Sequence, residues 1–469
     1  HLIRELGDRA EDPIKLSQDQ IDLTAVVAQH MDAIHMARTH GDAVSEPLQQ
    51  MVLLLHGQGG SGKTEVVNIA RDVAIEFKLE SKALASSNSA ARVIRGDTIH
   101  TGAHLAGQSS LLLSALEKGI TADFISEFED VEILIIEEVS LIPPKLLGAL
   151  SYRLCLAREN TRQAEPALYN TRGKAFGGIP LIIMLGDFMQ LAPFEGQCRV
   201  SLLNHTLKFG DEHCNGCRLF WDSMTHVHFL HGTHRFVDKK VKPPEPCPIL
   251  PRLFDYMRDP GGKPLDSDLW DAILSWKLKT DATGKVNDPR MSEHRFQEGH
   301  EMAIAWEAVA RMQKFRAFRD ARKHGQMLVY AQAVDIPRGH RLDRGQHFRA
   351  LQVVNMTNTG KLMGLVPLFL GMRVRLTAKL SGKHRVVQDA TGLVRDIIFD
   401  DREFSPGFAD WRDDDQDVRR RSGRVCLRYL PRGVLVKIDG YVEDVGYGEG
   451  VVLVRPRKQS WDFKAKLSP

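Results

Sequence analysis

Cysteine is scarce in this sequence: there are six in 469 residues, and the one close pair is the C-x-x-C of Cys214 and Cys217. Six are too few for a disulfide framework, so we expect the protein to occupy a reducing compartment. A zinc site needs a second pair of ligands at a recognisable spacing, and the sequence around Cys214 has none. Neither disulfides nor a structural metal is therefore predicted.

Long apolar runs and a strong net charge are also lacking. No segment approaches the roughly 18 to 20 apolar residues that span a membrane, so no membrane association is expected. The net charge is +3 at pH 7, so charge alone does not indicate a nucleic-acid-binding protein, and any such surface must be local. The chain begins with His1 rather than Met, which leaves open a missing N-terminal segment and a targeting peptide within it.

The pattern of the first half predicts an α/β fold. A chain of 469 residues accommodates about three domains of roughly 150 residues each. Short apolar runs alternate with helical stretches, and this alternation is typical of a parallel sheet with helices on both faces. The runs lie at residues 51–55, 81–85, 131–136 and 179–185.

The second half begins with a proline-rich loop at residues 242–248, followed by predicted helices at 249–258 and 267–276. Short alternating runs near the end predict a small antiparallel sheet or barrel. These runs lie at residues 425–429, 434–438 and 450–454.

A basic segment lies between these two parts. Residues 301–324 form an amphipathic stretch, and between residues 311 and 349 ten basic residues stand against three acidic ones. The segment is either a contact for a phosphate backbone or a solvated helix face, and the sequence does not decide between them.

Residues 57–64 read Gly-Gln-Gly-Gly-Ser-Gly-Lys-Thr and fill every fixed position of the phosphate-loop motif G-x-x-x-x-G-K-[ST]. An apolar strand precedes them and good helix formers follow. Glycines let backbone N–H groups approach phosphates, and the helix N-terminus adds a fractional positive charge. Lys63 is predicted to reach the β- and γ-phosphates, and Thr64 to hold Mg²⁺. The predicted nucleotide-binding residues are Gly57, Gly59, Gly60, Ser61, Gly62, Lys63 and Thr64.

Two adjacent carboxylates, Glu137 and Glu138, follow the apolar run at residues 131–136. Ligands of open parallel sheets gather where the strands end, so both carboxylates are expected near the phosphate loop. One, predicted to be Glu137, would hold Mg²⁺ directly or through water. The other, Glu138, would orient and deprotonate the attacking water.

A third segment, residues 185–193, ends another apolar run with Leu-Gly-Asp-Phe-Met-Gln-Leu-Ala-Pro. Its Gln190 can both donate and accept a hydrogen bond, which suits a sensor of the γ-phosphate or of the attacking water. Arg235, farther along the chain, is either an arginine finger that stabilises charge on the phosphate or a member of a surface ion pair.

In order and spacing, residues 57–64, Glu137-Glu138 and residues 186–193 resemble the motifs of the petite-integration-frequency (Pif) helicases. This family belongs to the 5′→3′ branch of superfamily-one DNA helicases, superfamily one B, and is related to RecD. The third motif, Gly-Asp-x-x-Gln-Leu-x-Pro, is unusual outside the group. The spelling of the motifs is nearest to helicases linked to Helitron-type transposons. The resemblance is strong to about residue 236 and patchy beyond it.

The resemblance implies further roles in nucleotide binding. Gln20, in the Leu-Ser-Gln-Asp-Gln of residues 16–20, lies at the family's adenine-reading Q motif. Arg235 falls at its motif IV arginine. The implied catalytic residues are Lys63, Glu138, Gln190 and Arg235.

The resemblance also implies where DNA binds. Residues 85–91 and 96–101 resemble the motif Ia region, which lies along single-stranded DNA in the family. Asn88, Thr98 and His100 are the candidate contacts.

The architecture implied by the resemblance is a RecA-like ATPase domain at residues 1–228, part of a second RecA-like domain at 229–384 and a small β-rich, SH3-like inserted domain at 385–469. The implied function is that of an ATP- and Mg²⁺-dependent DNA helicase and translocase. We expect a monomer that acts on single-stranded and tailed duplex DNA in repair, recombination and telomere maintenance. The expected compartment is the nucleus, with mitochondria as the alternative.

Two departures from the family pattern leave a second function open. Glu137 stands where the family has Asp, and the family's C-terminal motifs V and VI are not found before Pro469. The chain is then either a fragment or truncated gene model, or a protein that has lost coupled unwinding. The alternative function is an ATP-dependent module that binds single-stranded DNA without unwinding. A phosphate-loop kinase with a small-molecule acceptor fits neither the basic segment nor residues 186–193.

Overall fold

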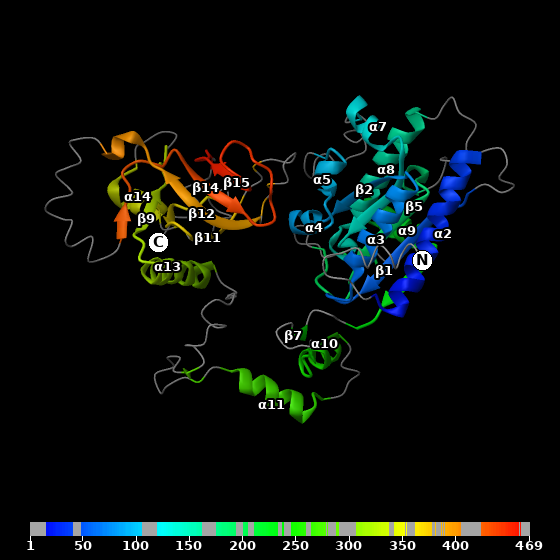
Figure 1. The fold of residues 1–469 in the computed structure, drawn as a ribbon, viewed down its shortest axis with the longest axis horizontal. Helices are drawn as coiled ribbons and strands as arrows, with labels where there is room; N and C mark the ends of the chain where they lie inside the picture. The colour runs from blue at the N-terminus through cyan, green and yellow to red at the C-terminus, as the bar shows by residue number, and fades with distance from the viewer. Residues whose placement is uncertain are drawn as a thin grey trace. The chain divides into compact units, whose positions relative to one another are not determined.

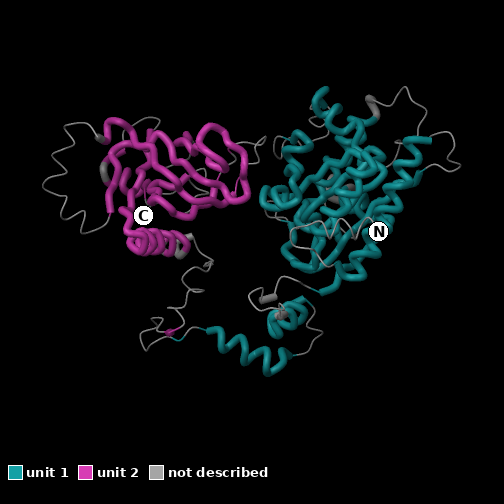
Figure 2. The backbone as a smooth tube through the Cα atoms, viewed as in Figure 1, with its two compact units in different colours: residues 1–286 teal, residues 287–469 magenta. Residues whose placement is uncertain are grey.

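The structure is a computed structural model in which the chain forms two compact units, residues 1–286 and 287–469 (Figures 1 and 2). Each unit is described by itself. The described residues are 16–40, 48–105, 120–161, 175–193, 200–204, 211–232, 237–238, 245–258, 264–277, 279, 288–289, 306–336, 342–351, 353, 362–377, 380, 386, 388, 390–404, 424–458 and 460.

The first unit is built on a six-stranded sheet with the strand order β3-β2-β4-β5-β1-β6. Every pair of neighbours runs parallel, which confirms the predicted parallel sheet. The strands are β1 (Met51–Gly57), β2 (Glu80–Ala85), β3 (Asp97–Thr98), β4 (Val131–Glu137), β5 (Leu181–Gly186) and β6 (His226–Leu230).

Helices cover both faces of this sheet, because successive side chains of its buried strands point to opposite sides (Figure 1). On one face, Leu53 and Ile135 pack with helices α2 (Gln18–His40) and α3 (Lys63–Glu76). On the other, Leu54 and Ile136 pack with α7 (Ala122–Phe128) and α8 (Pro144–Thr161), joined there by α9 (Asp211–Ser223). The central strands therefore have no solvent-facing side.

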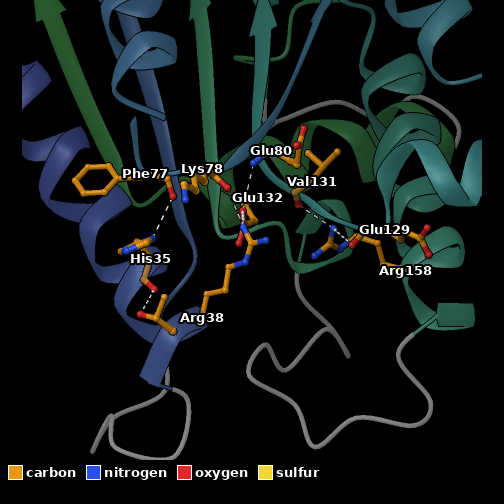
Figure 3. Close-up of polar contacts among 10 residues, drawn as sticks. His35, Arg38, Phe77, Lys78, Glu80, Glu129, Val131, Glu132 and Arg158 are labelled. Carbon is orange, nitrogen blue, oxygen red and sulfur yellow. Dashed lines mark hydrogen bonds and ion pairs between the residues drawn. The ribbon is translucent and has the colours of Figure 1, made fainter. Parts of the chain in front are cut away.

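An acidic side chain near the start of β4 fixes helix α2 to the sheet (Figure 3). Arg38 donates to a carboxylate oxygen of Glu132 at 3.3 Å and to the Lys78 carbonyl at 2.9 Å. The Glu80 N–H donates to the same Glu132 oxygen at 3.3 Å. Burial raises the pKa of Glu132, and the Arg38 charge opposes that rise.

A fully buried arginine, Arg158 in α8, joins three segments at the same edge (Figure 3). Its Nη1 donates to the carbonyls of Phe128, Glu129 and Val131 at 2.8, 3.1 and 2.9 Å, and its Nε donates to the Gly177 carbonyl at 2.9 Å. One guanidinium therefore binds carbonyls of the turn from α7 into β4, of the first residue of β4 and of Gly177.

Shorter elements complete the first unit. The helices predicted at residues 249–258 and 267–276 are confirmed as α10 (Leu250–Arg258) and α11 (Ser267–Trp276). The remaining elements are α4 (Asn88–Val93), α5 (Ile99–Gly102), η3 (Val139–Leu141), η4 (Ala175–Gly178), β7 (Val237–Asp238) and β8 (Glu245–Pro246).

The second unit contains the predicted amphipathic helix, α13 (Trp306–Lys323), and two small sheets. One sheet has the order β10-β9-β13. The other has the order β11-β12-β14-β15, is antiparallel throughout and contains the predicted runs at residues 434–438 and 450–454. The predicted run at residues 425–429 lies in the first sheet instead, because β13 pairs in parallel with β9. The elements are β9 (Leu328–Gln332), α14 (Arg344–Leu351), β10 (Leu365–Leu368), β11 (Arg373–Arg375), β12 (Thr391–Ile398), η7 (Asp401–Phe404), β13 (Arg424–Cys426), β14 (Gly433–Ile438) and β15 (Val451–Val454).

Strand pairing in the second unit interleaves distant segments, since β11 pairs with β12 while β13 pairs in parallel with β9. The domain boundaries predicted at residues 228 and 384 stay predictions. Among the described residues, no helix combines the length and apolar content that crossing a lipid bilayer would need.

Replacing Arg158 with Leu should destabilise the first unit strongly. The change leaves buried carbonyls without their donor, and breaking such a buried charged network costs about 3 to 5 kcal/mol. We expect the thermal midpoint to fall by about 10 °C. Arg218→Leu, an exposed position on α9, is the matched control and should shift the midpoint by no more than about 1 °C. Equal midpoints for the two variants in a thermal melt would refute the role given to Arg158.

Candidate nucleotide site

The carboxyl edge of the six-stranded sheet brings the predicted site residues together. The phosphate loop follows β1, Glu137 and Glu138 end β4, and Asp187 follows β5. Strand β5 pairs with both β1 and β4, so these three strand ends are neighbours. This is the edge at which open parallel sheets bind ligands.

The phosphate loop has the backbone that its glycines permit. Gly60 and Gly62 have φ angles of 90° and 84°, and a Cβ on Gly57 would lie 2.6 Å from the Ser61 hydroxyl. Helix α3 begins at Lys63. The Lys63 ammonium donates to the carbonyls of Gly57 and Gln58 at 2.6 and 3.1 Å. The loop therefore curls around the charge that the motif assigns to phosphate binding.

Both positive and negative charges act on the Lys63 ammonium. Burial lowers the pKa of its ammonium, and the charge of Arg258 lowers it further. The carboxylates of Asp187, Glu137 and Glu138 act in the opposite direction. Lys63 is thus close enough to all three acids to join the loop and the strand ends into one site.

Gln20, predicted to read adenine, contacts the phosphate loop directly. Its side chain is buried; the amide nitrogen donates to the Ser61 carbonyl at 3.0 Å and the amide oxygen accepts the Ser17 N–H at 2.8 Å. A Cβ on Gly62 would lie 2.2 Å from that nitrogen, so only glycine fits against Gln20. The structure therefore gives Gln20 a hold on the loop, and its contact with a base stays a prediction.

The two acids at the end of β4 differ in their surroundings. Glu137 is buried, and burial together with the neighbouring Glu138 raises its pKa to about 7, against the opposing charge of Lys63. Glu138 has a left-handed backbone with φ 54° and ψ 45°, a conformation that costs a non-glycine residue about 1 kcal/mol or more. The strand therefore ends at Glu137, and the chain turns at Glu138 into η3.

Asp187 organises the segment after β5. Its buried carboxylate accepts hydrogen bonds from Arg258 Nη1 at 2.5 Å, from the Met189 N–H at 3.1 Å and from the Gln190 amide at 3.2 Å. Burial alone would raise the pKa of Asp187, but these bonds hold it below its ordinary value. Asp187 thus positions Gln190, the predicted sensor, and joins it to α10.

A histidine from β1 supports the same segment. His56 stacks on Phe188 with ring centroids 6.0 Å apart, and its Nε2 accepts the Phe188 N–H at 3.1 Å. Burial lowers the pKa of His56, so the neutral ring can act as this acceptor.

Four buried oxygens at this edge have no hydrogen-bond partner among the described residues: Ser61 Oγ, Ser86 Oγ, Ser140 Oγ and Glu137 Oε2. Buried polar atoms are rarely left unpaired unless a ligand or water completes them. Hydroxyl and carboxylate oxygens are the donor set that Mg²⁺ prefers, and the glycine loop with Lys63 suits phosphates. The residues present therefore fit ATP and Mg²⁺, with Thr64 and Glu137 as the candidate metal ligands.

The DNA-contact candidates lie after the carboxyl ends of the two outermost strands on one side of the sheet. Asn88 begins α4, which Ser87 caps through the Ala90 N–H, and is half-buried. Thr98 caps α5 through the Thr101 N–H, and His100 is exposed. All three stay predictions, and Arg235 lies outside the described residues.

Helix α13 carries exposed basic residues and also contacts an arginine from β13. Lys314 and Arg322 are exposed, as is the ring of Phe315. Arg424, from β13, lies over the Phe318 ring at 3.8 Å. A phosphate contact and a solvated face both remain open for this helix.

The residues of the site that sequence reasoning missed include Arg258 and Ser86. Arg258 ends a helix 71 residues after Asp187, and no motif marks it. Ser86 directly follows β2, and its position after a buried strand was the available signal.

Glu137 should give the folded protein a specific pH dependence. Because its folded pKa is raised from 4.5 to about 7, the unfolded state loses this proton first as pH rises. Stability from this group is therefore complete below about pH 4.5, falls between pH 4.5 and 7, and stays low above. In urea unfolding without Mg²⁺, Glu137→Gln should be more stable than the wild type at pH 8 by on the order of 3 kcal/mol, with little difference near pH 4.5. The same gap at both pH values would argue against this assignment.

Comparison with known proteins finds similarity across the segment that holds the site. Residues 37–211 match the family model described as PIF1-like helicase, and this range holds the phosphate loop, both glutamates and Asp187. The ATP-dependent DNA helicase PIF1 of Danio rerio is 27% identical over 197 residues, which cover 40% of this chain and 28% of that protein.

Solved structures agree in fold. The crystal structure of Pif1 helicase from Candida albicans has a TM-score of 0.51 at 17% identity and covers 96% of this chain and 81% of its own. The Bacteroides Pif1 bound to ssDNA has a TM-score of 0.51 at 14% identity and covers 94% and 79%. Residues 37–211 are therefore similar to the PIF1-like helicases, and the fold is similar to that of these structures.

Proposed function

We propose that this chain is an ATP-dependent DNA helicase that hydrolyses ATP at the carboxyl edge of its parallel sheet and moves along single-stranded DNA. The observation that carries the proposal is the meeting of Lys63, the Glu137-Glu138 pair and the Asp187–Gln190 pair at one edge. These groups lie in the range that matches the family of helicases. The matched relative from Danio rerio is much longer than the matched segment, so the activity of the whole protein is itself part of the proposal.

Phosphate binding falls to the loop and its lysine. Backbone N–H groups of the loop and the start of α3 supply partial positive charge, and Lys63 supplies a full charge. The Lys63 ammonium donates to two loop carbonyls, Gly57 and Gln58, so its charge already lies inside the loop that is proposed to bind phosphate.

Hydrolysis needs a metal ion, a base and a group that orients water. Mg²⁺, when bound, neutralises charge on the β- and γ-phosphates. Thr64 and Glu137 are suited to hold it, and Glu138 to take the proton of the attacking water. Gln190, tethered to Asp187 at 3.2 Å, is held where it can orient that water.

DNA would bind beside the nucleotide. Asn88, Thr98 and His100 follow β2 and β3, whose ends share the edge with β4. A change at the phosphate site can therefore alter the DNA contacts through adjacent strand ends. The Bacteroides relative was solved bound to ssDNA. The 5′→3′ direction, a monomeric state, nuclear localisation and roles in repair, recombination and telomere maintenance rest on the family resemblance alone.

A second function keeps one observation in its favour. Burial and the neighbouring Glu138 raise the pKa of Glu137 to about 7, so below neutral pH a metal ion has to displace a proton from this carboxyl. An ATP-dependent module that binds single-stranded DNA without unwinding it would tolerate this competition.

The proposed function predicts that single-stranded DNA stimulates ATP hydrolysis and that Lys63→Ala removes it. Loss of a preorganised charge on the transferring phosphate lowers rates about 100-fold or more. The measurement is steady-state phosphate release with and without a DNA oligonucleotide. Lys145→Ala, on α8, is the control and should keep the wild-type rate.

Unwinding of a 5′-tailed duplex, and not of a 3′-tailed one, is the second half of this test. ATP binding without hydrolysis or unwinding would reject the helicase and favour the binding module.

DNA affinity should depend on His100. An exposed imidazole can stack on a base, and such stacking contributes about 1 to 3 kcal/mol. His100→Ala should therefore weaken binding of a single-stranded oligonucleotide about tenfold in fluorescence anisotropy at fixed salt. His40→Ala, in the last turn of α2 at the opposite edge of the sheet, should leave the affinity unchanged. Equal affinities for the two variants would exclude His100 from the DNA path.

A further inference from the structure

Helix α10 is attached to the nucleotide site through its last residue. None of the nine residues of α10 is fully buried. At its end, Arg258 Nη1 lies 2.5 Å from the buried carboxylate of Asp187. The helix thus delivers a guanidinium to the edge where phosphates are proposed to bind.

The guanidinium keeps most of its donors. Arginine has five N–H groups, and within the described part of the chain one of them, on Nη1, donates to a protein acceptor, Asp187. The side chain is 24% exposed, so the remaining donors can be reached by a ligand. The Asp187 carboxylate fixes one side of the planar fork and so orients the other.

The charge of Arg258 reaches the phosphate loop. Burial is the main cause that lowers the pKa values of Lys63 and His56, and the charge of Arg258 lowers both further. The field of Arg258 therefore extends from Asp187 to the residues at the end of β1. Three carboxylates act on Lys63 at this edge: Asp187, Glu137 and Glu138. A nucleoside triphosphate brings further negative charge, and Lys63 alone does not balance it. Beside Lys63 and the proposed Mg²⁺, Arg258 supplies a further permanent positive charge at this edge.

We propose that Arg258, oriented by Asp187, donates to the terminal phosphate of a bound nucleoside triphosphate and so distinguishes triphosphate from diphosphate. The inference rests on the proposed ATP-binding function and adds a residue and a role to it. A planar fork suits this task, since a guanidinium can bind a carboxylate and a phosphate oxygen through different N–H groups.

The arrangement also gives α10 a reason to respond to the nucleotide. The ion pair of Arg258 with Asp187 attaches the last residue of the helix to the segment that follows β5. A terminal phosphate adds a second anchor for the Arg258 charge, and its loss on hydrolysis removes the anchor. The position of α10 then depends on whether the nucleotide has two phosphates or three.

The test compares the binding of two nucleotides by the full chain in isothermal titration with Mg²⁺, one being ADP and the other a non-hydrolysable ATP analogue. Arg258→Ala should weaken binding of the analogue at least tenfold and change ADP binding by less than twofold. Arg258→Lys, which keeps the charge without the fork, should fall between Arg258→Ala and the wild type. Arg252→Ala is the matched control, because Arg252 lies on the same helix and pairs with the exposed Asp266 and Asp268. It should bind both nucleotides as the wild type does.

Equal weakening of both nucleotides by Arg258→Ala, or no weakening of either, would overturn the assignment. A thermal melt of each variant separates a lost contact from a damaged fold, and Arg258→Lys keeps the test decisive if Arg258→Ala is unstable. Failure of the proposed function gives a different result: the wild type would bind both nucleotides but show no DNA-stimulated hydrolysis. The role of Arg258 would then still be decided by the two binding affinities. A wild type that binds neither nucleotide would overturn both.

Discussion

The complete burial of the central strands is the constraint on which the rest of the first unit depends. Strands β4 and β5 are buried along their whole length, and β1 nearly so, because helices pack on both faces of the sheet. A charge inside such a strand would lose its hydration without gaining a partner. Ionisable groups therefore collect where strands begin and end. In β4 they are Glu132, near its start, and Glu137, its last residue.

Crowding at the carboxyl edge then makes each charged group depend on the others. Asp187 can stay ionised although buried because Arg258 and two N–H groups bind it. Glu137 has only the more distant Lys63 to oppose its burial and its acidic neighbour, so its pKa rises. Both acids lie at strand ends of the same sheet. Their pKa values are nevertheless shifted in opposite directions, because Asp187 accepts several hydrogen bonds and no donor to the Glu137 carboxylate is found among the described residues.

The elements that depend on local sequence patterns could be predicted. Strand positions, the phosphate loop and the helices α10, α11 and α13 follow from apolar runs, glycines and helical spacing. The glutamates and Gln190 could be placed because a residue directly after a buried strand must lie at the sheet edge. Long-range pairs could not be placed this way. Gln20 meets the carbonyl of Ser61, 41 residues away, and Arg258 meets Asp187 across 71 residues. Such pairings depend on how helices dock, and no local pattern encodes them.

The two ends of β4 differ in how their side chains are bound. At its start, Glu132 is held by Arg38 and Glu80, and the turn before it is held by Arg158. At its end, Glu137 has an oxygen with no protein partner in the described structure. Side-chain contacts therefore hold the start of the strand, and at its end a carboxylate oxygen remains available to a ligand. A change of the acid at residue 137 can therefore leave the contacts at the start of β4 intact, because Arg38, Glu80 and Arg158 act at the other end of the strand.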